Sequence, residues 1–267
     1  MHEVAFYDLG HAPYRPVWNL QAAIQQRLVD EKLARRKQKR QQFDRERQQP
    51  CGERHQSGRE SRDTLLFVEH PHIYTLGKSG DKAHLLKGTF ELAELEADFI
   101  EIDRGGDITY HGPGQIVGYP IFDMDRHFSD IHKYLRFLEE IVIRTCADFN
   151  INARRIEGLT GVWVGNQKIC AMGIKCSRWV TMHGFALNVN TDLSYFTHIV
   201  PCGISDKAVT SFRDIFGRKM DETEVKGRLL FHFEDVFDIQ ITNVNTLPEL
   251  DHRFSYLKQP GVKATSH

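Results

Sequence analysis

The sequence of 267 residues lacks most of the features that would assign it to a specialised class of protein. It has no run of about eighteen apolar residues, so it offers no candidate for a membrane-spanning helix. Its first residues, Met-His-Glu-Val-Ala-Phe-Tyr-Asp, show neither the basic nor the apolar region of a secretory signal. The 35 Lys and Arg residues nearly balance the 36 Asp and Glu residues, so no broad positive surface for nucleic acid is indicated. We therefore expect no nucleic-acid partner and no membrane partner.

Cysteine is also scarce, and its five occurrences are too scattered and too odd in number for a disulfide framework. No Cys-x-x-Cys pair is present, which disfavours a structural zinc site. His70 and His72 flank a proline, but no third ligand follows at a recognisable spacing, so we predict no metal. Free thiols are typical of a reducing cytoplasm, and we expect the protein to be cytoplasmic.

The remaining composition is that of an ordinary globular protein, with 40% hydrophobic and 27% charged residues. Strand-like and helix-like patterns follow one another without strict β-α-β alternation. This order predicts an α+β fold in which helices pack on a mixed β-sheet. We expect one domain over residues 1–258 and a loose tail at residues 259–267.

Local patterns predict the individual elements. Short apolar runs predict strands at residues 4–7, 65–68, 73–76, 98–102, 116–122, 162–164, 169–174 and 179–189. Apolar stripes at helical spacing, with capping residues, predict helices at about residues 16–33, 129–150, 206–217 and 221–237. In the second of these helices, Ser129 or Asp130 is the expected N-cap. In the third, Asp206 is the expected N-cap and Gly217 the stop.

A charged insertion at about residues 31–62 interrupts this pattern. From Arg35 to Arg47 the chain is almost entirely Arg, Lys, Gln, Asp and Glu, and the residues up to Asp63 stay polar. We expect a solvent-exposed helix extension followed by a mobile loop. The segment fits either a basic arm that meets an acidic partner or a solvated insertion, and its composition favours the second.

The stretch from Arg104 to Gln115 is the most unusual in the chain. It reads Arg-Gly-Gly-Asp-Ile-Thr-Tyr-His-Gly-Pro-Gly-Gln and lies between two strand-like runs. Glycine allows positive φ and lets the backbone approach a bound group closely. A long β-hairpin with a glycine-rich bend and a ligand-binding segment both fit this composition.

Cys202 is the cysteine best suited to nucleophilic chemistry. It lies between Pro201 and Gly203, and the glycine leaves a neighbouring amide unobstructed to stabilise an oxyanion. A free thiol has a pKa of about 8.5, so a nearby group must lower that pKa or accept the proton. Lys168, just after a predicted hairpin turn, and His183 are the two candidates, and sequence separation does not decide between them.

These residues carry a resemblance to the lipoyl(octanoyl) transferases, the octanoyltransferases of lipoate biosynthesis. The segment 104–115 looks like the signature of that family, and further similar motifs follow in the family's order. They are Glu69-His70-Pro71, Tyr74-Thr75-Leu76-Gly77, Gly161-Val162-Trp163-Val164, Lys168-Ile169, His183-Gly184-Phe185-Ala186-Leu187-Asn188 and Pro201-Cys202-Gly203. Two features depart from the family: His72 stands where a second proline is usual, and the charged insertion is longer than the usual connection.

The resemblance implies a fold like that of biotin and lipoate protein ligases, and the transfer of octanoyl from octanoyl-acyl carrier protein to a lysine. The implied acceptors are the lipoyl domains of 2-oxoacid dehydrogenase complexes and the glycine cleavage H protein. Cys202 matches the family's acyl-thioester cysteine, and Lys168 matches the lysine that lowers its pKa and handles protons. Thioester exchange is nearly balanced, so the reaction needs no ATP, and no cofactor is implied. The implied substrate-binding residues are Arg104, Gly105, Gly106, Asp107, Ile108, Thr109, Tyr110, His111, Ala171, Met172, Gly173, Gly184, Phe185 and Ala186.

Two other functions stay open from the sequence. An ATP-dependent lipoate or biotin protein ligase could use the same fold, although the cysteine and lysine in family positions count against it. A non-catalytic acyl-binding relative, acting as a scaffold or regulator, would form no acyl adduct on Cys202.

Overall fold

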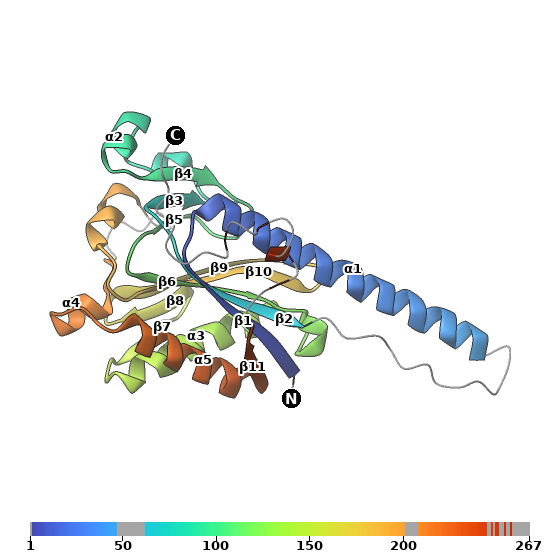
Figure 1. Cartoon of the computed structure of the whole chain (residues 1–267). Coiled ribbons are helices and arrows are strands. Elements are labelled where there is room, and N and C mark those ends of the chain that lie inside the picture. The colour runs from blue at the N-terminus through green and yellow to red at the C-terminus, as the bar shows by residue number, and fades with distance from the viewer. Residues whose placement is uncertain are drawn as a thin grey trace.

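The computed structural model describes residues 2–46, 62–200, 208–244, 247, 249, 250, 254 and 257. These residues form two β-sheets with helices packed on them, so the predicted α+β class is confirmed (Figure 1). The large sheet has the strand order β11-β1-β2-β6-β10-β9-β8-β7, and the small sheet has the order β4-β3-β5. The strands are β1 (His2–His11), β2 (Asp63–Glu69), β3 (Ile73–Leu76), β4 (Asp98–Glu101), β5 (Ile108–His111), β6 (Gln115–Ile121), β7 (Ala153–Ile156), β8 (Leu159–Val164), β9 (Gln167–Ser177), β10 (Val180–Asn188) and β11 (Ile239–Asn243).

The large sheet is mixed, as expected. Strand β1 pairs in parallel with both β2 and β11, whereas the remaining pairs of the large sheet are antiparallel. The central strand β2 is buried on both faces, because Leu65 and Phe67 belong to one core cluster and Leu66 and Val68 to another. Helices must therefore cover both sides of the sheet.

Helices α3 (Ile131–Asp148) and α5 (Glu222–Phe237) cover one face, and α1 (Tyr14–Glu46) crosses the other (Figure 1). The predicted helices at 129–150 and 221–237 are confirmed, and Asp130 and Asp221 accept hydrogen bonds as their N-caps. None of the helices in the described ranges is long and apolar enough to span a membrane. The shorter helical elements are η1 (Lys82–His84), α2 (Thr89–Glu94), η2 (Met124–Arg126), η3 (Leu193–His198) and α4 (Phe212–Phe216).

The helix predicted at 206–217 is wrong in its first half. Helix α4 begins only at Phe212, where the Ser211 side chain accepts a hydrogen bond from the amide of Asp214. Residues 208–210 instead pair with Lys168, whose amide donates to the Ala208 carbonyl at 3.0 Å. Pairing with a strand end therefore overrides the helical spacing of the apolar residues. Asp206, the expected cap, lies outside the described residues.

The helix extension expected beyond Arg35 is confirmed, because α1 continues to Glu46 and projects beyond the sheets (Figure 1). An ion cluster attaches this helix to the body: Lys32 Nζ lies 2.6 Å from Asp123 Oδ1, and both side chains are at most 3% exposed. Arg35 reaches the other oxygen of Asp123 at 3.0 Å. The expected loop at 47–61 and the tail at 259–267 lie outside the described residues, so the domain limits stay a prediction.

The segment 104–115 is not the bend of one hairpin. It contains its own strand, β5, which pairs with β3 in the small sheet, whereas the following strand β6 belongs to the large sheet. The segment therefore carries the chain from one sheet to the other. Its first turn packs directly against Gly77, where an added Cβ would lie 2.2 Å from the Gly106 carbonyl oxygen. Glycine is required at this close approach.

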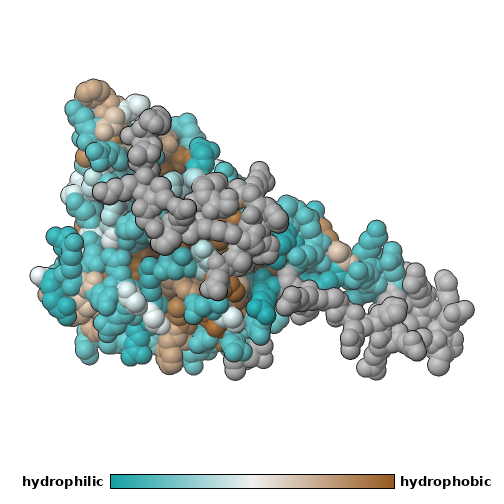
Figure 2. Space-filling model, in the orientation of Figure 1, coloured by the Kyte–Doolittle hydropathy of each residue, from teal (hydrophilic) through white to brown (hydrophobic). Residues whose placement is uncertain are grey.

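The visible surface of the described residues is mostly hydrophilic, with apolar residues gathered at a few places (Figure 2). One of them is the outer end of α2, at the top of the view, where Phe90 is 77% exposed.

Candidate functional site

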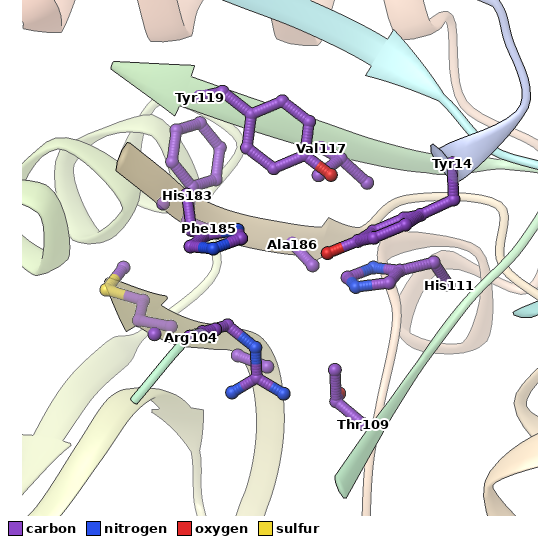
Figure 3. A pocket seen from close by; sticks show the side chains of 13 residues that line it. Tyr14, Arg104, Thr109, His111, Val117, Tyr119, His183, Phe185 and Ala186 are labelled. Atoms are coloured by element: carbon purple, nitrogen blue, oxygen red, sulfur yellow. The ribbon is translucent and has the colours of Figure 1, made fainter. Parts of the chain in front are cut away.

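A pocket lies between the two sheets, where β5 and β6 meet β9 and β10 (Figure 3). It holds about 350 Å³ of empty space, part of it open to solvent. It is lined by Tyr14, Arg104, Thr109, His111, Val117, Tyr119, Ala171, Met172, Gly173, His183, Gly184, Phe185 and Ala186.

Many of the predicted substrate-binding residues line this pocket. They are Arg104, Thr109, His111, Ala171, Met172, Gly173, Gly184, Phe185 and Ala186. The others are not among the lining residues, and they are Gly105, Gly106, Asp107, Ile108 and Tyr110. The fold therefore brings nine of the fourteen predicted residues together around one pocket, while the binding role of each residue stays a prediction.

Sequence reasoning missed three lining residues, Tyr14, Val117 and Tyr119. Val117 and Tyr119 are two residues apart on β6 and so share one face, and this alternation was a usable signal. Tyr14 begins α1, far from the motifs in sequence, and nothing in the neighbouring sequence indicated that it lines a pocket.

Small residues on β9 and β10 leave the space of the pocket open. Gly173 pairs with Gly184, and Ala171 pairs with Ala186. A Cβ on Gly173 would lie 2.7 Å from Arg104 Nη1, and one on Gly184 would lie 2.2 Å from the Gly118 carbonyl oxygen. A side chain at either glycine would therefore displace these neighbouring atoms.

Arg104 places a largely buried positive charge at the pocket. Its Nη2 donates to the Asp107 carbonyl and its Nη1 to the Gly105 carbonyl, both at 2.8 Å. The side chain is 9% exposed. Arg104 therefore holds the turn that follows it in place and contributes a fixed cation to the pocket.

Two imidazoles beside the pocket are kept neutral. Burial lowers the pKa of His70 to about 4 and that of His111 to about 3. For His111, the nearby His70 and Arg104 add to the effect. His70 donates from Nδ1 to the Ala12 carbonyl at 2.7 Å, so its Nε2 accepts from the Tyr119 hydroxyl at 2.8 Å.

His72 has a separate partner, since its Nδ1 lies 2.7 Å from the Tyr110 hydroxyl. His70 and His72 are thus engaged at different places. In the described ranges, no group of three or more His, Cys, Asp or Glu side chains is arranged to hold a metal ion.

His183 forms a pair with Asp103 at the pocket. Its Nε2 lies 3.1 Å from Asp103 Oδ1, and the side chain is 1% exposed. Burial lowers the pKa of His183, while Asp103 opposes that shift. The hydrogen bond from His183, together with Lys175, holds the pKa of Asp103 well below its usual value. His183 Nδ1 is buried and has no hydrogen-bond partner within the described part of the chain.

Lys168 lies at the start of β9, three residues before the pocket wall begins at Ala171. Its ammonium nitrogen is 4.8 Å from the centre of the Trp163 ring, and its backbone pairs with residues 208–210. Cys202 lies outside the described residues. The pairing of Cys202 with Lys168 or with His183 therefore stays a prediction.

The fold defines the class of protein. A bipartite lipoate protein ligase from Thermoplasma acidophilum has a similar structure, with a TM-score of 0.58, 15% identity and 99% of each chain covered. A lipoate-protein ligase A bound with ATP gives a TM-score of 0.59 at 17% identity, covering 73% of this chain and 84% of that chain. The chain thus has the fold of the lipoate protein ligases.

Sequence comparison is more specific. The family model of the lipoyl protein ligase A/B catalytic domain matches residues 47–234. An octanoyltransferase of Flavobacterium psychrophilum is 49% identical over 244 residues, which cover 89% of this chain and 98% of the relative. An octanoyltransferase of Cytophaga hutchinsonii is 51% identical over 242 residues, which cover 88% and 93%. The chain belongs to the lipoyl protein ligase A/B catalytic domain family, and the resemblance drawn from its motifs is confirmed.

Proposed function

We propose that this chain is an octanoyltransferase of lipoate biosynthesis that transfers octanoyl from octanoyl-acyl carrier protein to a lysine of a lipoyl domain. The observation that carries the activity is the identity of about one half to octanoyltransferases over nearly their whole length. The donor, the acceptor domains of 2-oxoacid dehydrogenase complexes and the glycine cleavage H protein, and a cytoplasmic location are parts of the proposal.

In the first step, the Cys202 thiolate attacks the thioester carbonyl of the donor. A bond forms between its sulfur and the acyl carbon, the bond from that carbon to the carrier sulfur breaks, and the carrier leaves as a thiolate that takes a proton from the Lys168 ammonium. Chain connectivity supports a role for Lys168 here, because Cys202 is only six residues before Ala208, which pairs with Lys168. Six extended residues span at most about 20 Å. A lysine ammonium near the sulfur would lower the thiol pKa.

In the second step, the acceptor lysine attacks the acyl-enzyme, an amide forms, and the Cys202 thiolate leaves. The attacking amine must be neutral, and its free pKa is about 10.4. A base must therefore take a proton from it. We assign this role to Lys168, which is a neutral amine once it has given its proton to the leaving carrier thiolate, and which regains a proton from the attacking amine.

The pocket supports an eight-carbon chain as the transferred group. Its wall is built from Val117, Ala171, Met172, Phe185 and Ala186, which offer an apolar surface. Each buried methylene contributes roughly 0.8 kcal/mol, so the length of the slot selects the length of the chain.

Intact mass spectrometry after incubation with octanoyl-acyl carrier protein, without ATP, tests the reaction class and the nucleophile together. The expected result is one octanoyl adduct on the wild-type chain and none on Cys202→Ser. Cys176→Ser is the matched control, because Cys176 is an exposed free thiol, and it should keep the adduct. Transfer that requires ATP would favour a ligase, and a wild-type chain without an adduct would favour a non-catalytic acyl-binding protein.

A further inference from the structure

A chain of buried side chains connects the pocket to the start of β9. Asn188 Nδ2 donates to the Thr210 carbonyl at 3.1 Å, and Gln115 Nε2 donates to Asn188 Oδ1 at 2.9 Å. Gln115 Oε1 lies 2.8 Å from His111 Nδ1. The side chains are at most 6% exposed, so each hydrogen bond is shielded from water.

The direction of these hydrogen bonds is forced by backbone carbonyls, which can only accept. The Thr210 carbonyl requires the amide nitrogen of Asn188, so the oxygen of Asn188 must face Gln115. Gln115 must then present its nitrogen to Asn188, and the same nitrogen also reaches the Tyr110 carbonyl at 3.3 Å. The oxygen of Gln115 is left for His111, so His111 Nδ1 carries the hydrogen.

His111 is neutral, and its second nitrogen is therefore an acceptor. In a neutral imidazole with its hydrogen on Nδ1, Nε2 keeps a lone pair. The charged and titratable groups near the ring are Tyr14, His70, Arg104 and His183, and the last three disfavour a positive charge on His111.

The His111 ring lines the pocket, stacked on Tyr14 with ring centres 5.6 Å apart (Figure 3). No hydrogen bond to Nε2 is formed within the described part of the chain. The pocket thus presents His111 Nε2 as an acceptor nitrogen of fixed orientation, in a lining that is largely apolar.

We propose that Gln115 and Asn188 are positioning residues that hold His111 as the neutral Nδ1–H tautomer, and that His111 Nε2 accepts a hydrogen bond from an N–H group of the substrate. This inference rests on the proposed function. In that reaction, N–H donors come from two sources: an amide in the arm that carries the donor thioester, and the amine of the acceptor lysine.

The same chain of hydrogen bonds also ends at Lys168. The backbone amide of Thr210 donates to the Lys168 carbonyl at 3.0 Å, and the backbone carbonyl of Thr210 accepts the hydrogen bond from Asn188. Asn188 therefore links the orientation of the His111 ring to the position of the strand end that carries Lys168. A displaced Asn188 would disturb both at once.

Nuclear magnetic resonance of the full chain, labelled with ¹⁵N in histidine, tests the tautomer. The wild-type His111 ring should show a protonated Nδ1 and an unprotonated Nε2 at pH 7. Gln115→Met keeps the volume but removes the acceptor, and it should shift His111 towards the other tautomer. Gln25→Met is the matched control, because Gln25 is also buried but donates to the Val180 carbonyl. A wild-type His111 that carries its hydrogen on Nε2, or that is an imidazolium, overturns the proposal.

Single-turnover measurement of the two half-reactions tests the role of Nε2. His111→Phe keeps a ring to stack on Tyr14 but has no acceptor, and it should slow one half-reaction about tenfold, as expected for one lost hydrogen bond. A slower acylation by octanoyl-acyl carrier protein identifies the arm amide as the donor. A slower discharge to a lipoyl domain identifies the lysine amine.

Unchanged rates in both half-reactions overturn the role of Nε2. If His111→Phe does not fold, Gln115→Met carries the same test, because it retains the imidazole, and a changed tautomer with unchanged rates then overturns the role. A wild-type chain that forms no adduct contradicts the proposed function instead, and it does so without altering the tautomer that the resonance measurement finds.

Discussion

At the scale of single residues, the space of the pocket depends on glycines, which have no side chain to fill it. Replacing Gly173 by Ala would put a Cβ 2.7 Å from Arg104 Nη1 and 2.8 Å from the Gly105 carbonyl oxygen. We expect Gly173→Ala to fold but to form the octanoyl adduct at least about tenfold more slowly, the consequence of an overpacked wall costing about 1–3 kcal/mol. Rapid-quench mass spectrometry measures the rate.

The matched control for that change is Gly227→Ala. Gly227 lies within helix α5, and a Cβ there would meet no atom within 4 Å. Because alanine favours a helix over glycine, this variant should be more stable by about 0.5–1 kcal/mol, with an unchanged acylation rate. An equal loss of rate in both variants would argue against the packing explanation.

The buried imidazoles predict sensitivity to mild acid. His70 and His111 have pKa values lowered to about 4 and about 3, below the unfolded value of about 6.5. Between pH 6.5 and pH 4 these two imidazoles therefore bind up to two more protons in the unfolded chain than in the folded chain. As the pH falls through this window, these two residues should therefore lower the free energy of unfolding by up to about 2.7 kcal/mol per pH unit.

Urea unfolding at pH 7, 6 and 5 measures this slope, and His111→Phe should reduce it by about half. His132→Gln, at an exposed position of α3, is the control and should leave the slope unchanged. Equal stability of the wild-type chain at pH 5 and pH 7 would contradict the prediction.

Lys168 is predicted to keep the thiol of Cys202 ionised. Lys168→Ala should shift the pH at which acylation reaches half its maximum upward, towards the free thiol pKa of about 8.5. Lys168→Arg retains the positive charge and should restore part of the shift. If His183→Gln moves the profile and Lys168→Ala does not, the base is His183.

The residues that the sequence singled out were those with distinctive chemistry. The Arg104 segment stood out because glycines and mixed polar residues rarely cluster, and Cys202, whose role stays a prediction, because of its flanking proline and glycine. Tyr14 carried no such mark, since an aromatic residue usually belongs to a core. Only the packing of α1 against the sheet brings it to the pocket.

At the scale of elements, local signals succeeded where they were complete. Strand β3 was predicted with its exact bounds, 73–76, and the N-cap of α3 was predicted to be Ser129 or Asp130. Helix α4 was misplaced because the pairing of residues 208–210 with Lys168 is a long-range contact. Strand β11 was missed for the same reason, since its pairing with β1 joins distant parts of the chain.

The cap of α3 gives a prediction at this scale. The Asp130 side chain accepts hydrogen bonds from the amides of His132 and Lys133, at 2.9 and 3.0 Å. Asp130→Ala should lower the free energy of unfolding by about 1 kcal/mol. Ser129→Ala, at the neighbouring position that sequence alone did not exclude, should change it by no more than a few tenths. Denaturant midpoints at a constant m-value decide between them.

At the scale of the whole molecule, α1 is attached to the sheets by buried charge as well as by apolar contacts. Lys32 and Asp123 are almost fully buried, and Arg35 also contacts Asp123. Asp123→Ala would leave Lys32 buried with Asp125 as its remaining ion-pair partner in the described part of the chain, so we expect a loss of about 3 kcal/mol in unfolding free energy. Asp235→Ala breaks an exposed ion pair with Arg144 and should cost less than about 1 kcal/mol.

The charged insertion remains consistent with both roles that the sequence left open. Residues 31–62 hold eleven Lys and Arg residues against five Asp and Glu residues, in a chain whose net charge is −1. Positive charge is thus concentrated where α1 leaves the body of the molecule (Figure 1). This charge would attract an acidic protein through long-range electrostatics, with an effect that falls as salt increases.

Because Thr109 and His111 come from the small sheet while Val117, Ala171 and Ala186 come from the large one, the pocket lies at the seam between the two sheets. A fatty acyl chain seated there would add apolar contacts to the hydrogen bond between His111 and Gln115 that already joins the sheets. Amide hydrogens of β3 and β5 should then exchange with solvent more slowly on acylation, together with those of β9 and β10, although no strand gains a hydrogen bond.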